Sequence, residues 1–253
     1  MFDKMLSKIG IGAATVDTVL HEAEVMRGEV LTGEVRMKGG KSAQKINQVY
    51  LDLQTQYVEE GSNGFTTHTH TLHRLEIADA FTLDAGEEVV YDFELQIPLE
   101  TPISFGSSQS WVQTGLDVSW AFDPKDHDPI QVLPDPASDM VLGAAEELGF
   151  IHSDLSGRCL AMETPFDSPF VQVFEMKSTG PIAQHVEYLN ILIAADDEQA
   201  HVQLDIDRRH GGMLGWVADG MGRDVALLDF SVPHDAEFGT AELEDILRQA
   251  VGH

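Results

Sequence analysis

Apolar and polar residues alternate with a period of two along most of this sequence. The clearest stretch is residues 46–58, where Val49, Leu51 and Leu53 are apolar and Asp52 lies between them. Successive side chains of a β-strand point to opposite faces, so the alternation places one face in a core and the other in water. The pattern predicts an all-β protein.

Strands are expected throughout the chain, separated by turns. The expected strands cover residues 16–20, 30–37, 46–58, 65–81, 89–97, 111–122, 170–176, 186–195, 202–206 and 225–232. A polar corner at Asp196–Gln199 lies between the strands at 186–195 and 202–206. These two strands are therefore expected to form a hairpin.

Three other stretches repeat their apolar residues with helical spacing. Ser138 or Asp139 is the expected cap of a short helix that runs to Phe150, and Thr240 is the expected cap of a helix near the C-terminus. Residues 2–9 carry the third apolar stripe. We favour docking of the two terminal stripes onto the protein's own body, with binding to a partner or a membrane surface as the alternative.

Proline and aspartate are concentrated in the middle of the chain. The prolines are Pro124, Pro129, Pro134 and Pro136. This composition is typical of an inter-domain linker, so we expect two domains, residues 1–133 and residues 134–253. The nearby aspartates could bind calcium, but their spacing lacks the EF-hand pattern, and a solvated linker is the interpretation we favour.

The charge limits the partners that this protein can have. The chain has 253 residues, of which 43 are Asp or Glu and 15 are Lys or Arg, so its net charge is −28. Nucleic acids and anionic membranes attract basic proteins, and neither is an expected partner. No apolar run is long enough for a membrane span or a signal peptide, and the single Cys159 excludes an internal disulfide, so we expect a cytoplasmic protein.

The acidic residues are dispersed along the chain and form no block of like charge. Such a coat is typical of proteins from a salty cytoplasm, where ions screen the repulsion between carboxylates. We therefore hypothesise that this protein is adapted to salt.

Histidine and threonine alternate in the segment Thr66–His73. On a strand, His68 and His70 point from the same face about 7 Å apart, which is near enough to bind one metal ion if a third ligand converges. This arrangement is the basis of one hypothesis, a metal-binding module or metal-dependent enzyme centred on His68 and His70. The alternative, which we favour, is a solvated strand of an acidic protein.

The motifs that organise nucleophilic or phosphate chemistry are missing from the sequence. It contains no Gly-x-Ser-x-Gly elbow and no phosphate-binding loop. Cys159 lies beside apolar residues in an expected strand, where a buried, inert thiol is favoured over a reactive one. We expect neither an enzyme nor a cofactor.

Several segments of the chain are similar to one known family. The segments that carry the similarity are residues 2–18, 24–35, 39–40, 170–175 and 205–209. They resemble, in the same order, the bacterial sporulation-control (SpoOM) family, whose members have an arrestin-like fold. The resemblance implies two tandem arrestin-like β-sandwiches, residues 1–133 and residues 134–253, with short helices at the N-terminus, in the linker and at the C-terminus.

The resemblance also implies a non-enzymatic regulatory or scaffold protein that acts in the cytoplasm through contacts with other proteins. A homodimer is compatible with the sequence. The candidate contact patch lies in a glycine-rich apolar segment and comprises Met213, Leu214, Trp216 and Met221. The alternative for these four side chains is that they fill a core.

Overall fold

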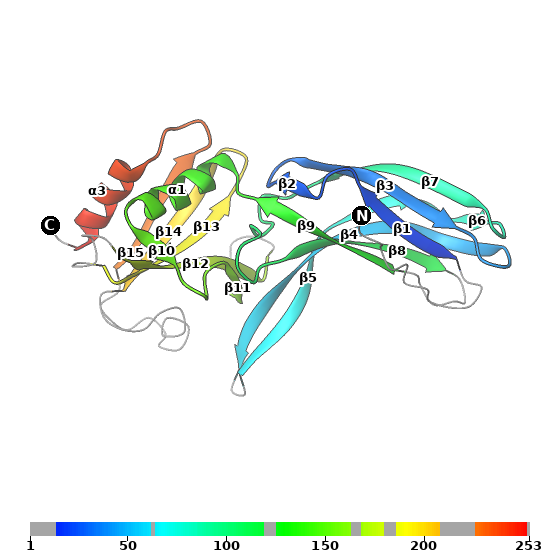
Figure 1. The fold of residues 1–253 in the computed structure, drawn as a ribbon, viewed down its shortest axis with the longest axis horizontal. Coiled ribbons are helices and arrows are strands. Elements are labelled where there is room, and N and C mark those ends of the chain that lie inside the picture. Colours follow the sequence, from blue (N-terminus) through cyan, green and yellow to red (C-terminus); the bar gives the residue numbers. More distant parts are fainter. Residues whose placement is uncertain are drawn as a thin grey trace. The chain divides into compact units, whose positions relative to one another are not determined.

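The computed structural model describes residues 14–61, 64–118, 125–162, 168–179, 186–207 and 226–251. Strands make up most of these residues, and the prediction of an all-β protein is confirmed (Figure 1). The chain divides into two compact units. The first unit is formed by residues 1–55, 69–101 and 109–132, and the second by residues 56–68, 102–108 and 133–253.

The first unit contains two sheets. Their strands are β1 (Thr15–Leu20), β2 (Glu24–Met26), β3 (Val30–Lys38), β6 (Phe81–Leu83), β7 (Glu88–Gln96), β8 (Ser110–Val118), nearly all of β9 (Lys125–Leu133) and most of β4 (Gln44–Gly61) and β5 (Gly64–Ala78). One sheet has the order β1-β3-β7, and both of its pairings are antiparallel. The other runs β4-β8-β9-β2, with β5 and β6 also paired to β4.

Alternate residues of both sheets meet in one core. Val35 of β3, Leu95 of β7, Leu51 and Leu53 of β4 and Leu116 of β8 are fully buried in a single cluster. The alternation seen in the sequence therefore becomes two inward faces packed against each other, which is a β-sandwich.

A polar link joins β1 to the other sheet inside this core. Thr18 of β1 is fully buried, and its hydroxyl forms a hydrogen bond with the hydroxyl of Thr114 on β8. Its backbone N–H donates to Oδ2 of Asp126 on β9 at 2.7 Å. The edge of β1 is thus hydrogen-bonded by a side chain of the facing sheet.

The predicted linker is wrong for residues 125–133, because these residues form strand β9. β9 pairs antiparallel with β8, from Gly115 opposite Lys125 to Ser110 opposite Ile130. Pro129 lies opposite Trp111, and proline can occupy a strand position whose N–H is not needed by the ladder. Long-range pairing with β8 therefore overrides a composition that locally indicates a loop.

The second unit is built on one sheet. Its elements are α1 (Pro136–Glu147), β10 (Phe150–His152), β11 (Arg158–Ala161), β12 (Phe170–Ser178), β13 (Tyr188–Ala195), β14 (Gln199–Asp207), β15 (Ala226–Pro233) and α3 (Thr240–Val251). The order is β15-β14-β13-β12, and β10 and β11 both pair with β12. β13 and β14 form the predicted hairpin, with Tyr188 opposite Asp207 and Ala195 opposite Ala200.

Both helices cover the same face of this sheet. Val141 of α1 and Leu243 and Leu247 of α3 are fully buried in one cluster with Phe174 of β12 and Ile191 of β13. The stripe of α3 therefore docks on the protein's own sheet, as we favoured from the sequence. The two helices therefore form the layer that buries this face of the sheet. The stripe at residues 2–9 lies outside the described residues.

Helix α1 begins earlier than predicted. Its N-cap is Asp135, whose Oδ1 accepts the N–H of Ser138 at 3.0 Å and whose Oδ2 accepts the Ser138 hydroxyl at 2.6 Å. Ser138 and Asp139, the predicted caps, lie inside the first turn. The reason is Pro136, whose fixed φ and missing N–H suit the first helical position directly after an aspartate cap.

Two segments from earlier in the chain complete the second unit. Gln172 of β12 binds one of them: its Oε1 accepts the N–H of Ile103 at 2.8 Å, and its Nε2 donates to the carbonyls of Ile103 at 2.7 Å and Gly157 at 3.0 Å. The other segment contributes Val58, which pairs with Leu160 of β11. One buried amide side chain thus incorporates residues 102–108 into this unit.

Two glycines allow the close approach of this segment. Gly106 has φ +59° and Gly157 has φ +82°, a region that favours glycine. A Cβ at Gly106 would lie 2.5 Å from the carbonyl oxygen of Ser156, and one at Gly157 would lie 2.6 Å from that of Phe105. Both positions therefore require glycine for conformational and for steric reasons.

We expect Gln172→Ala to destabilise the second unit by about 3 kcal/mol, because it leaves buried backbone groups of Ile103 and Gly157 without their partner. Urea unfolding followed by tryptophan fluorescence and circular dichroism would measure the change. Gln203→Ala is the matched control, since its amide donates at 2.9 Å to the exposed carboxylate of Asp229 rather than to buried backbone groups. A loss below about 1 kcal/mol in Gln172→Ala would contradict the role assigned to this amide.

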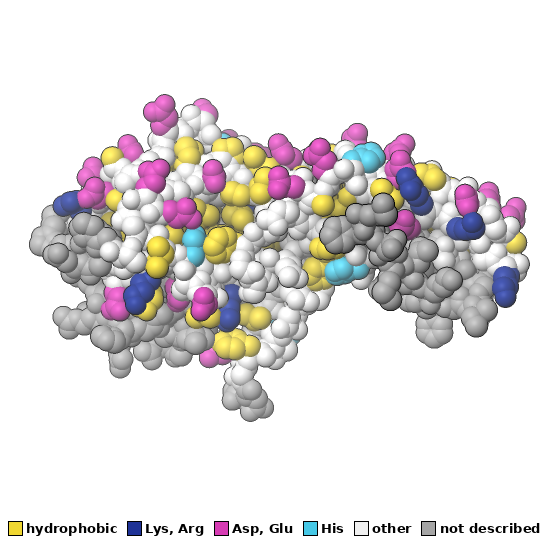
Figure 2. Space-filling view, in the orientation of Figure 1, with side chains coloured by type: hydrophobic (Ala, Val, Ile, Leu, Met, Phe, Trp, Pro, Cys, Tyr) yellow, Lys and Arg dark blue, Asp and Glu magenta, His cyan; other side chains and the backbone are white. Residues whose placement is uncertain are grey.

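The hypothesis of salt adaptation has a direct thermal test. Acidic side chains are spread over the face shown in Figure 2, with few Lys and Arg among them. We expect the unfolding midpoint to rise between about 0.05 M and about 2 M KCl, because screening weakens the repulsion among carboxylates. Sucrose of equal osmolality controls for solute exclusion. A flat or falling midpoint in KCl would exclude salt adaptation.

Candidate functional site

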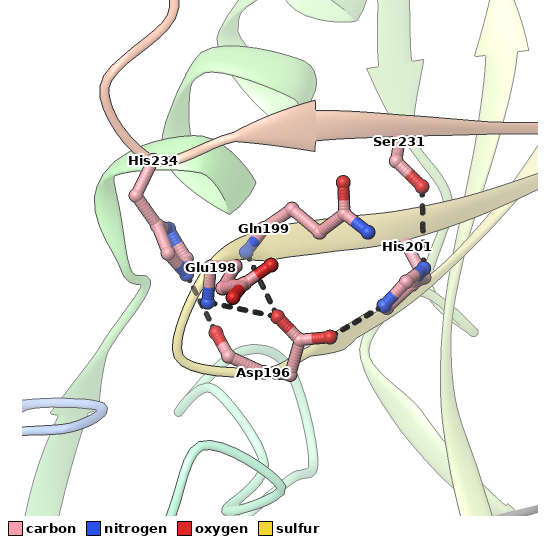
Figure 3. Close-up of polar contacts among 6 residues, drawn as sticks. All are labelled: Asp196, Glu198, Gln199, His201, Ser231 and His234. Atoms are coloured by element: carbon pink, nitrogen blue, oxygen red, sulfur yellow. Dashed lines mark hydrogen bonds and ion pairs between the residues drawn. The ribbon is translucent and has the colours of Figure 1, made fainter.

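A cluster of polar residues surrounds the corner that joins β13 to β14 (Figure 3). Asp196 is at its centre: its Oδ1 accepts the backbone N–H groups of Glu198 and Gln199, each at 2.9 Å. A carboxylate that binds the backbone two and three residues ahead forms an Asx-type turn. The corner is therefore closed by its own first side chain.

The second oxygen of the same carboxylate contacts a histidine. Oδ2 of Asp196 lies 2.8 Å from Nε2 of His201 on β14, and Nδ1 of His201 lies 3.2 Å from the hydroxyl of Ser231 on β15 (Figure 3). The hydrogen bond from His201, followed by those from the two backbone N–H groups, lowers the pKa of Asp196 to about 2. Asp196 is thus ionised throughout the neutral range.

Serine, imidazole and carboxylate in this order have the connectivity of an activated hydroxyl. In this protein, however, the side chains of His201 and Asp196 are 42% and 46% exposed. A carboxylate in water holds an imidazole less firmly than one in a buried site, and hydration weakens the electrostatic effect. The arrangement is better suited to joining β14 and β15 to the corner than to activating Ser231.

His234 extends the cluster to the start of α1. Its Nε2 lies 2.8 Å from the backbone carbonyl of Asp196, so this nitrogen carries a proton. Its Nδ1 lies 3.5 Å from Oδ1 of Asp135, the N-cap of α1. His234 therefore connects β15, the hairpin corner and the cap of α1.

The sequence did not single out these residues as a site. Asp196 was expected in a turn, and the roles of His201, Ser231 and His234 were missed. The short distance from Asp196 to His201 along the chain is a local signal for their contact. Ser231 and His234 have no such signal, because the pairing of β14 with β15 brings them to the corner.

The predicted metal ligands have other contacts. Nε2 of His68 lies 2.9 Å from Oε2 of Glu59, and its ring stacks on Tyr57 with centroids 5.2 Å apart. Burial lowers the pKa of His70, opposed by the nearby charge of Glu100. Within the described residues, no three His, Cys, Asp or Glu side chains form a group that could hold a metal ion. The metal role of His68 and His70 stays a prediction.

Two other candidates from the sequence have different outcomes. Cys159 is buried as predicted, and burial raises the pKa of its thiol to about 12, which makes it a poor nucleophile. The patch of Met213, Leu214, Trp216 and Met221 lies outside the described residues. Its role as a contact surface stays a prediction.

The two edges of the sheet β1-β3-β7 differ. On β1, the N–H of Thr18 donates to Asp126, and the N–H of the preceding Ala14 donates to Oε1 of Gln44 at 2.7 Å. On the other side, β7 pairs with β3 alone among the described strands. One edge is therefore bonded by the protein's own side chains, and the other has no further strand beside it among the described residues, so we call it the open edge.

The orientation of the β7 backbone follows from its ends. Gly39 donates to the carbonyl of Glu87, and Ile97 donates to the carbonyl of Glu29, so odd-numbered residues of β7 bond to β3. In an antiparallel ladder the intervening residues point their N–H and C=O groups away. Along β7 these outward residues are Glu88, Val90, Asp92, Glu94 and Gln96. They form the outer ladder of β7.

The first unit has two packed sheets, and the second unit is also largely β. The protein is therefore in the class of all-β proteins with an arrestin-like fold. A family model described as SpoOM protein matches residues 2–210. The chain belongs to the SpoOM family, as the resemblance in its sequence indicated.

Two comparisons extend over nearly the whole chain. The Sporulation-control protein spo0M of Bacillus subtilis (strain 168) is 33% identical over 252 residues, which is 98% of this chain and 96% of that protein. The crystal structure of Spo0M, sporulation control protein, from Bacillus subtilis matches with a TM-score of 0.81 and 32% identity, over 95% of this chain and 100% of that one. No helix in the described ranges has the length and hydropathy needed to cross a membrane.

The lowered pKa of Asp196 predicts acid sensitivity. Because the folded-state pKa is about 2 and the ordinary value is 3.8, the charged contacts stabilise the fold above about pH 5, and this contribution disappears as the pH falls toward 2. Asp196→Asn keeps the turn acceptor but removes the charge. We expect it to be less stable than wild type at neutral pH, with the difference shrinking steadily in acid.

Urea unfolding between about pH 7 and about pH 3 would measure this difference. Asp197→Asn is the control, since it removes the same charge from an exposed carboxylate that lies next to Asp196 in the chain. If the difference in unfolding free energy between wild type and Asp196→Asn did not depend on pH, the charge of the carboxylate would not be what stabilises the corner.

Proposed function

We propose that this protein is a non-enzymatic regulatory protein of the cytoplasm, and that it acts as a scaffold by binding other proteins. Its relative from Bacillus subtilis is named for sporulation control, which supports a regulatory role. The observation that carries the protein-binding part is the outer ladder of β7. An open strand edge can receive an extended segment of another protein as an additional strand.

The groups with catalytic potential favour binding over catalysis. Asp196 and His201 are both about half exposed to water, and the thiol of Cys159 is buried with a raised pKa. Neither environment produces the activated nucleophile that acyl or phosphoryl transfer needs. The net charge of −28 also argues against nucleic acid as the partner.

The open edge is a weak candidate for pairing with a second copy of this chain. Two copies joined antiparallel through β7 would place Asp92 and Glu94 of one near the same residues of the other. Like charges directly opposite each other destabilise a strand pair. The partner that we propose is therefore a different protein.

Val90 allows the edge to be blocked without disturbing β3. Its backbone N–H belongs to the outer ladder, so Val90→Pro removes one outward donor and leaves the bonds to β3 in place. In the native organism, we expect deletion of the gene to change the transcript profile. A Val90→Thr copy should restore the profile, and a Val90→Pro copy should not.

The same position reports contact with a partner. A photo-crosslinking residue at position 90 should capture a protein in cells, and the same residue at position 203 serves as the control, because Gln203 lies in the interior strand β14. Thermal unfolding would verify that both variants fold. An unchanged transcript profile on deletion, together with no crosslink specific to position 90, would contradict the proposal.

A further inference from the structure

We propose that the outer ladder of β7 binds an extended segment in which Lys or Arg alternates with small apolar residues. This inference rests on the proposed function and adds the chemistry of the partner. It is based on the charges, the exposure and the register of β7. Together they indicate which side chains an added strand would carry on each of its two faces.

The outer face of β7 has carboxylates without cationic partners. Asp92 and Glu94 are exposed, and no Lys or Arg among the described residues forms an ion pair with them. Asp92 lies directly opposite another acid, Glu34 of β3. An added strand with Lys or Arg at the facing positions would replace this repulsion by attraction.

The cations of β3 are already engaged. Nη2 of Arg36 lies 2.8 Å from Glu34, and Nζ of Lys38 lies 2.7 Å from Glu88 on β7. Neither is therefore available to Asp92 or Glu94. Among the described residues, the acids of this edge therefore have no Lys or Arg to neutralise them, and a basic segment of another molecule would supply that charge.

The other side chains of an added strand would meet the core. Val89 and Tyr91 of β7 are partly buried and pack against the hydrophobic cluster of the first unit. Small apolar residues beside them would extend this cluster at its margin. On the outer face, Val90 is 54% exposed and provides one apolar position among the acids. Basic and apolar residues thus alternate along the proposed partner strand.

Charged residues on an edge strand also protect proteins against aggregation. That explanation predicts no binding of any strand to β7. That explanation gives no role to Val90, whose exposed side chain would offer a bound strand one apolar contact among the acids. Charge complementarity and Val90 together favour a partner of the chemistry given above.

A synthetic peptide of sequence KVKVKVVVK matches this register, with its lone outward valine opposite Val90 in an antiparallel pairing. We expect it to bind the full-length protein at low salt, and fluorescence anisotropy would measure the affinity. A second peptide of the same sequence carries a methyl group on the backbone nitrogen of each lysine. It keeps the positive charges but loses the backbone hydrogen bonds to β7, and it should bind at least about tenfold more weakly.

Charge reversal at the edge tests the location. We expect Asp92→Lys combined with Glu94→Lys to weaken binding at least about tenfold. Asp197→Lys combined with Asp245→Lys is the control, because it makes the same change of charge at exposed positions of the second unit. If both double variants weakened binding equally, or if both peptides bound equally well, the binding would come from the overall charge of the protein and not from the edge of β7. Either result would overturn the proposal.

Amide hydrogen exchange gives a readout that general attraction would not change. The amides of Val90, Asp92 and Glu94 point away from β3, whereas those of Val89 and Tyr91 are on the side bonded to β3. On addition of the peptide, the outward amides should become protected while the inward ones stay as they were. Binding without this protection would also overturn the proposal.

The outcome separates the two proposals. A crosslink at position 90 in cells, with no binding of the basic peptide, would retain the protein-binding function and exclude the basic partner. Absence of both would remove the protein-binding function itself.

Discussion

Backbone N–H and C=O groups that leave the sheet ladders must find other partners, and this requirement organises the polar side chains of both units. Asp126 accepts the N–H of Thr18 at the edge of β1, and Asp135 accepts that of Ser138 at the start of α1. Asp196 does the same for the β13–β14 corner, and Gln172 for the segment that contains Ile103. Buried or turn-forming polar side chains thus determine where strands and helices begin, end or have an edge. The alternation of apolar residues determines the interiors of the strands.

The acidic composition consequently has two roles. Asp126, Asp135 and Asp196 use their carboxylates on backbone groups of the protein itself. Asp92 and Glu94 lie exposed on an edge strand, and no Lys or Arg of the described residues forms an ion pair with them. The net charge therefore combines structural acids with a coat, and the coat includes the edge on which the proposed binding depends.

The sequence predicted the strands well and their surroundings less well. β4, β7, β12 and the β13–β14 hairpin occur where the alternation predicts them, since side-chain periodicity is local information. β9 was assigned to a linker because proline and aspartate indicate loops, and only its ladder with β8 shows otherwise. The cap of α1 lies earlier than the sequence pattern predicts, because Pro136 is the first helical residue rather than part of the loop.

From the sequence alone follow the all-β class, the family and the burial of Cys159, because periodicity, motif order and local composition are properties of the chain itself. The tertiary structure decided which segments share a unit. Residues 102–108 belong to the second unit through hydrogen bonds from Gln172, which is distant along the chain. It also decided that β7 is an edge and β14 is not. Strand order depends on pairings between distant segments, and such pairings leave no periodic signal in the strands that they join.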